Sequence, residues 1–140
     1  MCQNEIGYLD LAISNFQNSI RINPKFIDAH FNLGIISKEL GKKDISMNSF
    51  ENVLKINPQN FQAHRNLSVM KKFSSDDPQI LIMESLINKD NLNQSDYIEL
   101  NFALAKVYED LGDSEKLFKF LNKGNQLKKE LLNYSFEKDQ

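Results

Sequence analysis

Two histidines are the first residues here whose type and spacing suggest chemistry. His30 and His64 lie 34 residues apart, and each follows an alanine. Imidazole is a common zinc ligand, but a zinc site needs further nitrogen, sulfur or oxygen donors. No carboxylate or thiolate lies at a typical ligand spacing, and the lone cysteine, Cys2, excludes an internal disulfide. We therefore predict that both histidines are structural and that the chain holds no metal and no other cofactor.

The paired acids are better explained as helix caps than as catalytic groups. Asp76 and Asp77 come directly before Pro78, and a helix commonly begins with an aspartate cap followed by proline. Three further acids flank a later turn, where we expect water to solvate them: Glu109, Asp110 and Asp113. Residues 91–102 offer many oxygens but place Asp96 where a calcium loop requires glycine. We predict no catalytic residues, so the chain by itself is not expected to be an enzyme.

A repeat with a period of 34 residues organises these positions. The following pairs match at that offset: Gly7 and Gly41, Phe16 and Phe50, Ile22-Asn23-Pro24 and Ile56-Asn57-Pro58, Ala29-His30 and Ala63-His64, Asn32-Leu33 and Asn66-Leu67. A period of this length is typical of helical repeat arrays. The sequence thus predicts a helical repeat protein.

Residues 27–60 form the one complete copy of the repeat. Apolar residues follow helical spacing on both sides of the segment Gly-Lys-Lys-Asp at 41–44. Gly41 suits the left-handed conformation that ends a helix, Asp44 is expected to cap the next helix, and Pro58 ends it. Gly34 leaves room for close helix contact. The pattern predicts a helix, a turn and a second helix.

This pattern resembles the tetratricopeptide repeat. The residues that carry the resemblance are Leu33-Gly34, Gly41, Phe50 and Pro58. Two positions depart from the family, with Ser46 where alanine is usual and His30 where tryptophan is frequent. The resemblance implies an all-α, right-handed α-solenoid of antiparallel helix pairs that binds a protein or peptide through its concave face.

Repeat matching divides one domain, residues 1–140, into five parts. Residues 1–24 resemble the latter half of a repeat, with Gly7 at the turn, and 27–60 are the complete repeat. Residues 61–97 are a degenerate, longer repeat in which a helix over 80–86 is followed by one capped by Ser95. Residues 98–132 are a fourth repeat whose last helix, from Ser114, caps the array, and 133–140 are a tail.

The C-terminal half also resembles the arm that joins such repeats to a sulfotransferase domain in many bacterial proteins. The segments that carry this resemblance are AHRNLS at 63–68, DDP at 76–78, FALAKVYEDLGD at 102–113 and Gly124-Asn125. The Gly-rich phosphate-binding loop of that domain has no counterpart here. This resemblance implies a non-catalytic repeat arm or fragment of a sulfotransferase.

In the tetratricopeptide family the first helix of each pair lines the concave groove. Matching by residue selects Phe31, Asn32, Ile35, Lys38, Arg65, Asn66, Val69, Lys72, Phe102, Lys106 and Glu109. The apolar members would hold side chains, and Asn32 and Asn66 would bond the backbone of an extended peptide. An ordinary helix surface is the alternative. The two-lysine carboxylate clamp of some chaperone-binding members is incomplete, because Gln62 and Glu99 replace one lysine.

Charge and composition limit the classes of partner that this chain is expected to bind. The net charge is -2, the pI is about 5.7 and the lysines are scattered, so nucleic acid is not an expected partner. No apolar run approaches about 20 residues, and the N-terminus lacks a signal region, which predicts no membrane contact and a cytoplasmic location. A half repeat at the N-terminus would leave Ala12, Phe16 and Ile20 with one neighbour only. This predicts either a homodimer through that helix or a gain in stability when an upstream helix is restored. A purely structural assembly module is a third alternative.

Overall fold

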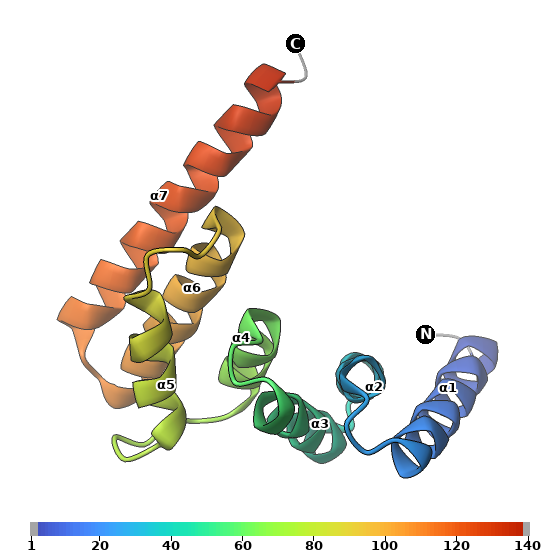
Figure 1. Cartoon of the computed structure of the whole chain (residues 1–140). Coiled ribbons are helices and arrows are strands. Elements are labelled where there is room, and N and C mark those ends of the chain that lie inside the picture. The colour runs from blue at the N-terminus through green and yellow to red at the C-terminus, as the bar shows by residue number, and fades with distance from the viewer. Residues whose placement is uncertain (1–2, 139–140) are drawn as a thin grey trace. The chain divides into compact units, whose positions relative to one another are not determined.

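The computed structural model describes residues 3–138, and within that range all regular structure is α-helical (Figure 1). The helices are α1 (Gln3–Ile22), α2 (Ile27–Glu39), α3 (Lys43–Ile56), α4 (Phe61–Met70), α5 (Pro78–Ile87), α6 (Gln94–Leu111) and α7 (Ser114–Lys138). Side chains are described from residue 7 to residue 134. The all-α prediction is confirmed for this part of the chain.

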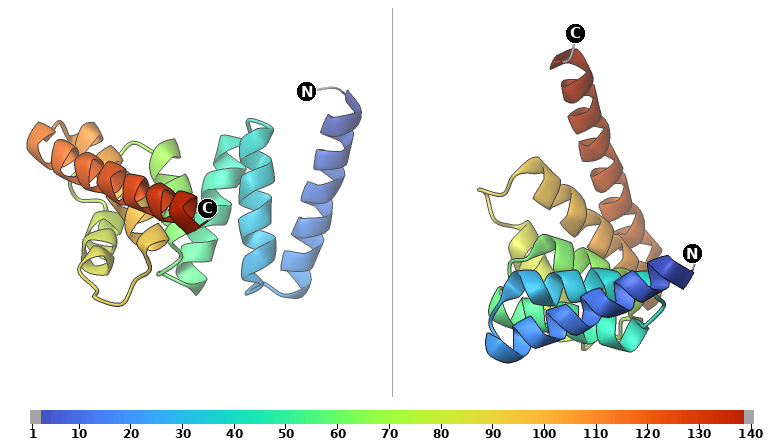
Figure 2. Two further views of the ribbon diagram at one scale, coloured as in Figure 1. Left: turned by 90° about the horizontal axis from the view of Figure 1, so that it is seen from above. Right: turned by 90° about the vertical axis from the view of Figure 1, so that its right-hand side faces the viewer.

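The chain divides into two compact units, Met1–Ala63 and His64–Gln140, with the division inside α4. In the first unit, α1, α2 and α3 lie side by side as antiparallel neighbours (Figure 2). In the second unit, α5 packs on α6 and α6 packs on α7. The repeat boundaries predicted from the sequence remain predictions.

The turn between α2 and α3 has the predicted left-handed glycine, but the residue at the cap position of α3 differs from the prediction. Gly41 has a φ of 74°, and the N–H of Lys42 donates to the carbonyl oxygen of Ser37 at 2.8 Å. This left-handed glycine ends α2 as predicted. Asp44 does not cap α3: the cap position is Lys42, whose side chain makes no capping bond. Asp44 instead lies in the first turn, where its charge complements the helix dipole.

Close contact between α2 and α3 explains why position 34 is a glycine. A Cβ atom there would lie 2.8 Å from Cζ of Phe50, whose side chain is fully buried. The hydroxyl of Ser46 donates to the carbonyl oxygen of Gly34 at 2.6 Å. Serine in place of the usual alanine is therefore accommodated, because its buried hydroxyl finds an acceptor on the neighbouring helix.

Gly7 is not at a turn. It lies inside α1, and among the described glycines only Gly41 and Gly112 have positive φ. A single glycine costs about 1 kcal/mol in a helix interior, which the surrounding helical residues tolerate. The match of Gly7 to Gly41 therefore gave a wrong local structure, although Phe16 and Ile20 are half-buried as helix-packing residues.

The second unit begins its helices on Asp77 and Asn93. The carboxylate of Asp77 accepts a hydrogen bond from the N–H of Gln79 at 3.0 Å, and Pro78 opens α5, as predicted. Asn93, not Ser95, caps α6, because its side chain accepts from the N–H of Asp96 at 2.8 Å. Both residues are good caps, and the helix uses the earlier one.

The core of the second unit is formed by side chains with at most 6% exposure from α5 and α6: Ile80, Met83, Leu86, Leu100, Leu104 and Val107. Gly112 has a φ of 75° and ends α6. The predicted capping helix is α7, which continues past the start of α6 (Figure 1). In the range that the structure describes, no helix combines the length and hydropathy needed to cross a bilayer.

Candidate functional site

The second unit brings two of the predicted groove residues together. The guanidinium carbon of Arg65 lies 5.1 Å from the ring centroid of Phe102, and Nε of Arg65 lies 3.6 Å from Oε2 of Glu99. The side chains of Arg65 and Glu99 are 35% and 36% exposed. A cation is thus placed over an aromatic ring at a surface that water reaches.

Phe102 is fixed from behind by α7. A Cβ atom on Gly124 would lie 2.9 Å from Cε1 of Phe102, so only glycine lets the ring pack this closely against that helix. The Phe102 side chain remains half-buried. The ring is therefore a preorganised part of the surface rather than a mobile side chain.

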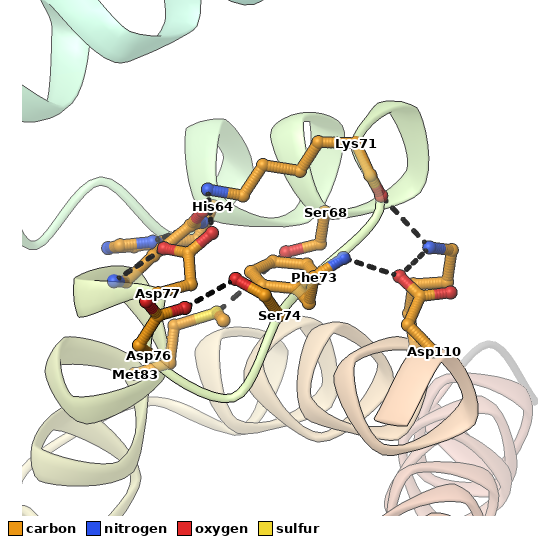
Figure 3. Close-up of polar contacts among 11 residues, drawn as sticks. His64, Ser68, Lys71, Phe73, Ser74, Asp76, Asp77, Met83 and Asp110 are labelled. Carbon is orange, nitrogen blue, oxygen red and sulfur yellow. Dashed lines mark hydrogen bonds and ion pairs between the residues drawn. The ribbon is translucent and has the colours of Figure 1, made fainter. Parts of the chain in front are cut away.

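Lys106, also predicted for the groove, is held in a polar network with Lys71 and Asp110, both labelled in Figure 3. Its ammonium donates to the carbonyl oxygen of Lys71 at 3.0 Å and to Oδ2 of Asp110 at 2.5 Å. The same Asp110 oxygen accepts from the backbone N–H of Phe73 at 3.0 Å. Lys106 thereby connects α6 to the irregular segment between α4 and α5, so its ammonium already has two partners within the fold.

Asp110 is not the solvated turn residue that we expected. Its side chain is 12% exposed, and burial alone would raise its pKa. Hydrogen bonds from Lys106 and Phe73 outweigh burial and lower the pKa of Asp110 below its ordinary value of 3.8, and the positive charge of Lys72 acts in the same direction. Asp110 therefore stays ionised and anchors the segment.

Phe73 is the apolar centre of this network. Its side chain is 4% exposed, and the ammonium groups of Lys71 and Lys106 lie 4.7 and 6.0 Å from its ring centroid. Lys71 also pairs with Asp77 at 2.8 Å, which joins the helix cap to the same cluster. The sequence carried one signal for this arrangement, a phenylalanine inside the otherwise polar stretch KKFSSDD.

The other predicted groove residues differ in exposure. In the second unit Val69 is 46% exposed, Lys72 and Glu109 are exposed, and Asn66 is half-buried with a polar partner. In the first unit, Phe31 meets Phe50 edge to face at 5.6 Å, and its ring is therefore also part of the α2–α3 packing. The remaining members on α2 are exposed or half-buried: Asn32, Ile35 and Lys38.

Each histidine has a structural bond within its own unit. In the first unit, Nε2 of His30 lies 2.8 Å from the carbonyl oxygen of Pro24, to which it donates. In the second, Nδ1 of His64 lies 3.1 Å from Nε2 of Gln79 and accepts from that amide. Among the described side chains, no group of three histidine, cysteine, aspartate or glutamate residues is arranged to hold a metal.

Two segments of the chain match a known repeat family. Residues 27–60 and 98–130 match the sequence model of the family described as tetratricopeptide repeat. The second match starts 71 residues after the first, three more than two periods of 34, which agrees with a longer intervening unit. Segments that match the tetratricopeptide repeat model therefore lie on both sides of the irregular segment 71–77.

Solved structures support the same fold. The crystal structure of MamA superimposes with a TM-score of 0.65 at 18% identity, covering 93% of this chain and 74% of MamA. A second structure, MamA MSR-1 C2, has a TM-score of 0.57 at 21% identity, covering 90% of this chain and 71% of the other. With the helix pairs described above, these matches confirm the predicted solenoid of antiparallel helix pairs.

One sequence relative comes from Aquifex aeolicus (strain VF5). This uncharacterized protein is 34% identical over 67 residues, which make up 48% of this chain. The aligned region covers 9% of the relative, so this chain matches only a small part of a much longer protein. A segment similar to about half of this chain therefore occurs within one longer protein.

Proposed function

We propose that this chain is a scaffold that binds a protein or peptide, and that the surface around Arg65 and Phe102 is a contact site. The observation that carries the proposal is the arginine placed over a ring that α7 holds rigid. Arginine and aromatic residues are enriched among the side chains that contribute most to protein interfaces. The tetratricopeptide repeats support a role in protein interaction.

The chemistry of this surface favours a partner with a carboxylate beside an apolar group. Arg65 is only loosely paired with Glu99, at 3.6 Å, so a partner carboxylate can approach the same guanidinium. Val69, which is exposed, and Phe102, which is half-buried, offer apolar contact. In the first unit, we assign Phe31, Asn32, Ile35 and Lys38 to the same function on the basis of their matching repeat positions.

The test compares the chain's two arginines. Arg65→Ala is expected to weaken the binding of a captured partner. Arg21→Ala is expected to leave that binding unchanged, because Arg21 is exposed and its side chain bonds to Asn18 of its own helix. Both variants change the same charge. Affinity measured by titration of the purified partner decides between them. Equal affinities would remove the Arg65 surface from the site.

The resemblance of 63–68 and 102–113 to a sulfotransferase-linked arm supports a second candidate, a non-catalytic arm that positions substrate for a linked domain. The two candidates differ in the partner: the arm requires a sulfotransferase domain in the same or an adjacent reading frame. Sequencing of the flanking coding region would show whether its phosphate-binding loop is present.

We also propose that α1 mediates a homodimer. Tyr8 and Leu11 are 76% and 59% exposed on this helix, and they lie one turn apart. Exposed apolar side chains at helical spacing suit a second helix. Phe16 and Ile20 are half-buried, so the face that includes them is already used in part for packing within the unit.

A further inference from the structure

A cleft of about 700 Å³ lies in the second unit among α5, α6 and α7, apart from the Arg65 surface. Its apolar walls are Ile87 from α5, Tyr97 from α6, and Phe120 and Leu127 from α7. Tyr97 and Phe102 are five positions apart on α6, which places them about 140° apart around the helix. The cleft therefore opens on a different side of α6 from the aromatic ring beneath Arg65.

The different lengths of the helices explain why this cleft exists. Helix α5 ends at Ile87, and residues 88–93 are not helical, whereas α7 continues to Lys138. Side chains on the middle of α7 thus lack a helical neighbour on this side. The edges of the cleft are fixed: the Tyr97 hydroxyl donates to the carbonyl oxygen of Lys89, and the Gln94 amide donates to that of Leu127 at 3.0 Å.

The rim of the cleft is cationic. Lys119 and Lys123 line it, and Lys116 lines a smaller adjoining hollow of about 240 Å³ that shares Ile87, Asn88, Lys119 and Phe120. The three lysines recur at i, i+3 and i+7 on α7, which places them along one face of that helix. Their charges therefore act on the same side of the opening.

Two of these lysines are held beside aromatic rings. The ammonium of Lys116 lies 5.0 Å from the ring centroid of Tyr108, and that of Lys119 lies 5.3 Å from that of Phe120. The rings of Tyr108 and Phe120 stack on each other at 5.6 Å. Both lysines are exposed to water, and their ammonium groups also lie next to aromatic rings of the apolar walls.

Little negative charge opposes these lysines. Glu84 is the carboxylate that lines the adjoining hollow, and it accepts the hydrogen bond of the Tyr108 hydroxyl. Within residues 7–134, whose side chains are described, no carboxylate forms an ion pair with Lys116, Lys119 or Lys123. The opening therefore combines apolar walls with three lysines that form no ion pair among the described side chains, while the carboxylates of Glu84 and Asp113 lie near Lys116.

We propose that this cleft binds an acidic amphipathic segment of a partner protein, with an apolar side chain between Ile87 and Phe120 and carboxylates beside Lys119 and Lys123. The cleft volume lies in the usual range of about 300–1,000 Å³ for binding pockets. An amphipathic helix that lays its apolar face into a groove is a common mode of peptide recognition. The complementary charge selects an acidic segment and accelerates its association.

Charge reversal tests the proposal with a matched control on the same helix. Lys119→Glu/Lys123→Glu changes the rim, whereas Lys128→Glu/Lys129→Glu makes the same charge change at exposed positions outside the cleft. The probe is a fluorescein-labelled helical peptide with leucine and phenylalanine at i, i+3, i+4 and i+7 and glutamate elsewhere. A second peptide carries lysine in place of every glutamate. Fluorescence anisotropy gives the Kd of each pair.

We expect the acidic peptide to bind the unaltered chain. Its Kd should rise about tenfold with the rim variant, because attraction at two positions becomes repulsion. The control variant is expected to change Kd by less than about threefold, since its charges lie farther from the peptide. In NMR spectra of the unaltered chain, the acidic peptide should shift the backbone amides of Asn88, Tyr97 and Lys123.

Several results would overturn this assignment. Equal binding of the acidic and lysine peptides would exclude charge recognition, and equal weakening by both double variants would show attraction to the helix as a whole. Amide shifts around Arg65 instead of Tyr97 would place the peptide on the other face. Binding of phosphatidylglycerol vesicles that is lost in the rim variant, without binding of the peptide, would assign the lysines to a lipid surface.

Discussion

Replacement of Asp110 should release the segment between α4 and α5. In Asp110→Ala, the Phe73 N–H loses its acceptor at 3.0 Å and the Lys106 ammonium loses its partner at 2.5 Å. Asp110→Asn keeps an oxygen for the Phe73 N–H but removes the negative charge. The two variants therefore separate the backbone hydrogen bond from the ion pair.

The magnitude follows from these two bonds. Hydrogen bonds to charged groups contribute about 1.5–3 kcal/mol each, and an unsatisfied buried N–H costs about 1–3 kcal/mol. The Lys106 side chain is 23% exposed, so water can solvate part of the released ammonium and its share is smaller. We expect the free energy of unfolding to fall by about 3 kcal/mol in Asp110→Ala and about 1.5 kcal/mol in Asp110→Asn.

Two measurements check these values. Urea unfolding followed by circular dichroism gives the global change, and amide hydrogen exchange at Phe73 reports the segment itself, since the chain divides into two units that need not unfold together. Glu109→Ala is the control, because that neighbouring carboxylate is exposed and its loss should change stability by less than about 0.5 kcal/mol.

The pH dependence gives an independent check. The pKa of Asp110 is lowered in the fold, so its contribution is present above the pKa of an unfolded aspartate, about 3.9, and is lost as the pH falls through the lower folded value. Asp110→Asn should lack this acid-dependent loss. A loss of less than about 0.5 kcal/mol in Asp110→Ala, with unchanged exchange at Phe73, would refute the anchoring role.

Three further predictions follow from contacts described above. Gly34→Ala should lower the free energy of unfolding by about 1–2 kcal/mol, because the new methyl group meets Phe50 at 2.8 Å. Gly7→Ala should raise it by up to about 1 kcal/mol, because a Cβ atom there has nothing within 4 Å. Thermal unfolding of both variants checks these values. Burial and the hydrogen bond to Glu84 raise the pKa of Tyr108 to about 12. The free energy of unfolding should therefore fall between pH 10 and pH 12, because the unfolded tyrosine ionises first. Tyr108→Phe should remove this slope in alkaline unfolding, and an unchanged slope would contradict the assignment. If α1 mediates a dimer, light scattering should show a concentration-dependent dimer that Leu11→Glu converts to monomer, and a monomer at every concentration would exclude that interface.

Features that depend on neighbouring residues could be predicted from the sequence. Gly41 ends α2 and Asp77 caps α5, because each role depends on the conformation of one residue and the N–H groups that follow. The same local rules could not choose between Asn93 and Ser95, since both side chains can cap. Gly7 shows the opposite error, in which a repeat match predicted a turn where the chain continues as a helix.

Features that depend on distant residues could not be predicted in this way. Asp110 and Phe73 are 37 positions apart, and nothing in the spacing of either residue indicates that they meet. Family matching placed Lys106 in the groove by position alone, but its ammonium reaches the carbonyl oxygen of Lys71. The cleft beside Phe120 likewise depends on where α5 ends relative to α7, which is a property of packing.

The anchor of the irregular segment also has a consequence for the order of folding during synthesis. A regular repeat can form its helix pair soon after its own residues leave the ribosome, because each repeat contacts mainly its neighbours. Here the segment after α4 needs Lys106 and Asp110, which are synthesised 35 to 37 residues after their partners. At about 5–20 residues per second, the α4–α5 pair therefore waits roughly two to seven seconds with Phe73 uncovered. During that interval, a nascent chain stalled before α6 should be more accessible to chaperones and proteases at residues 71–77 than one stalled after it.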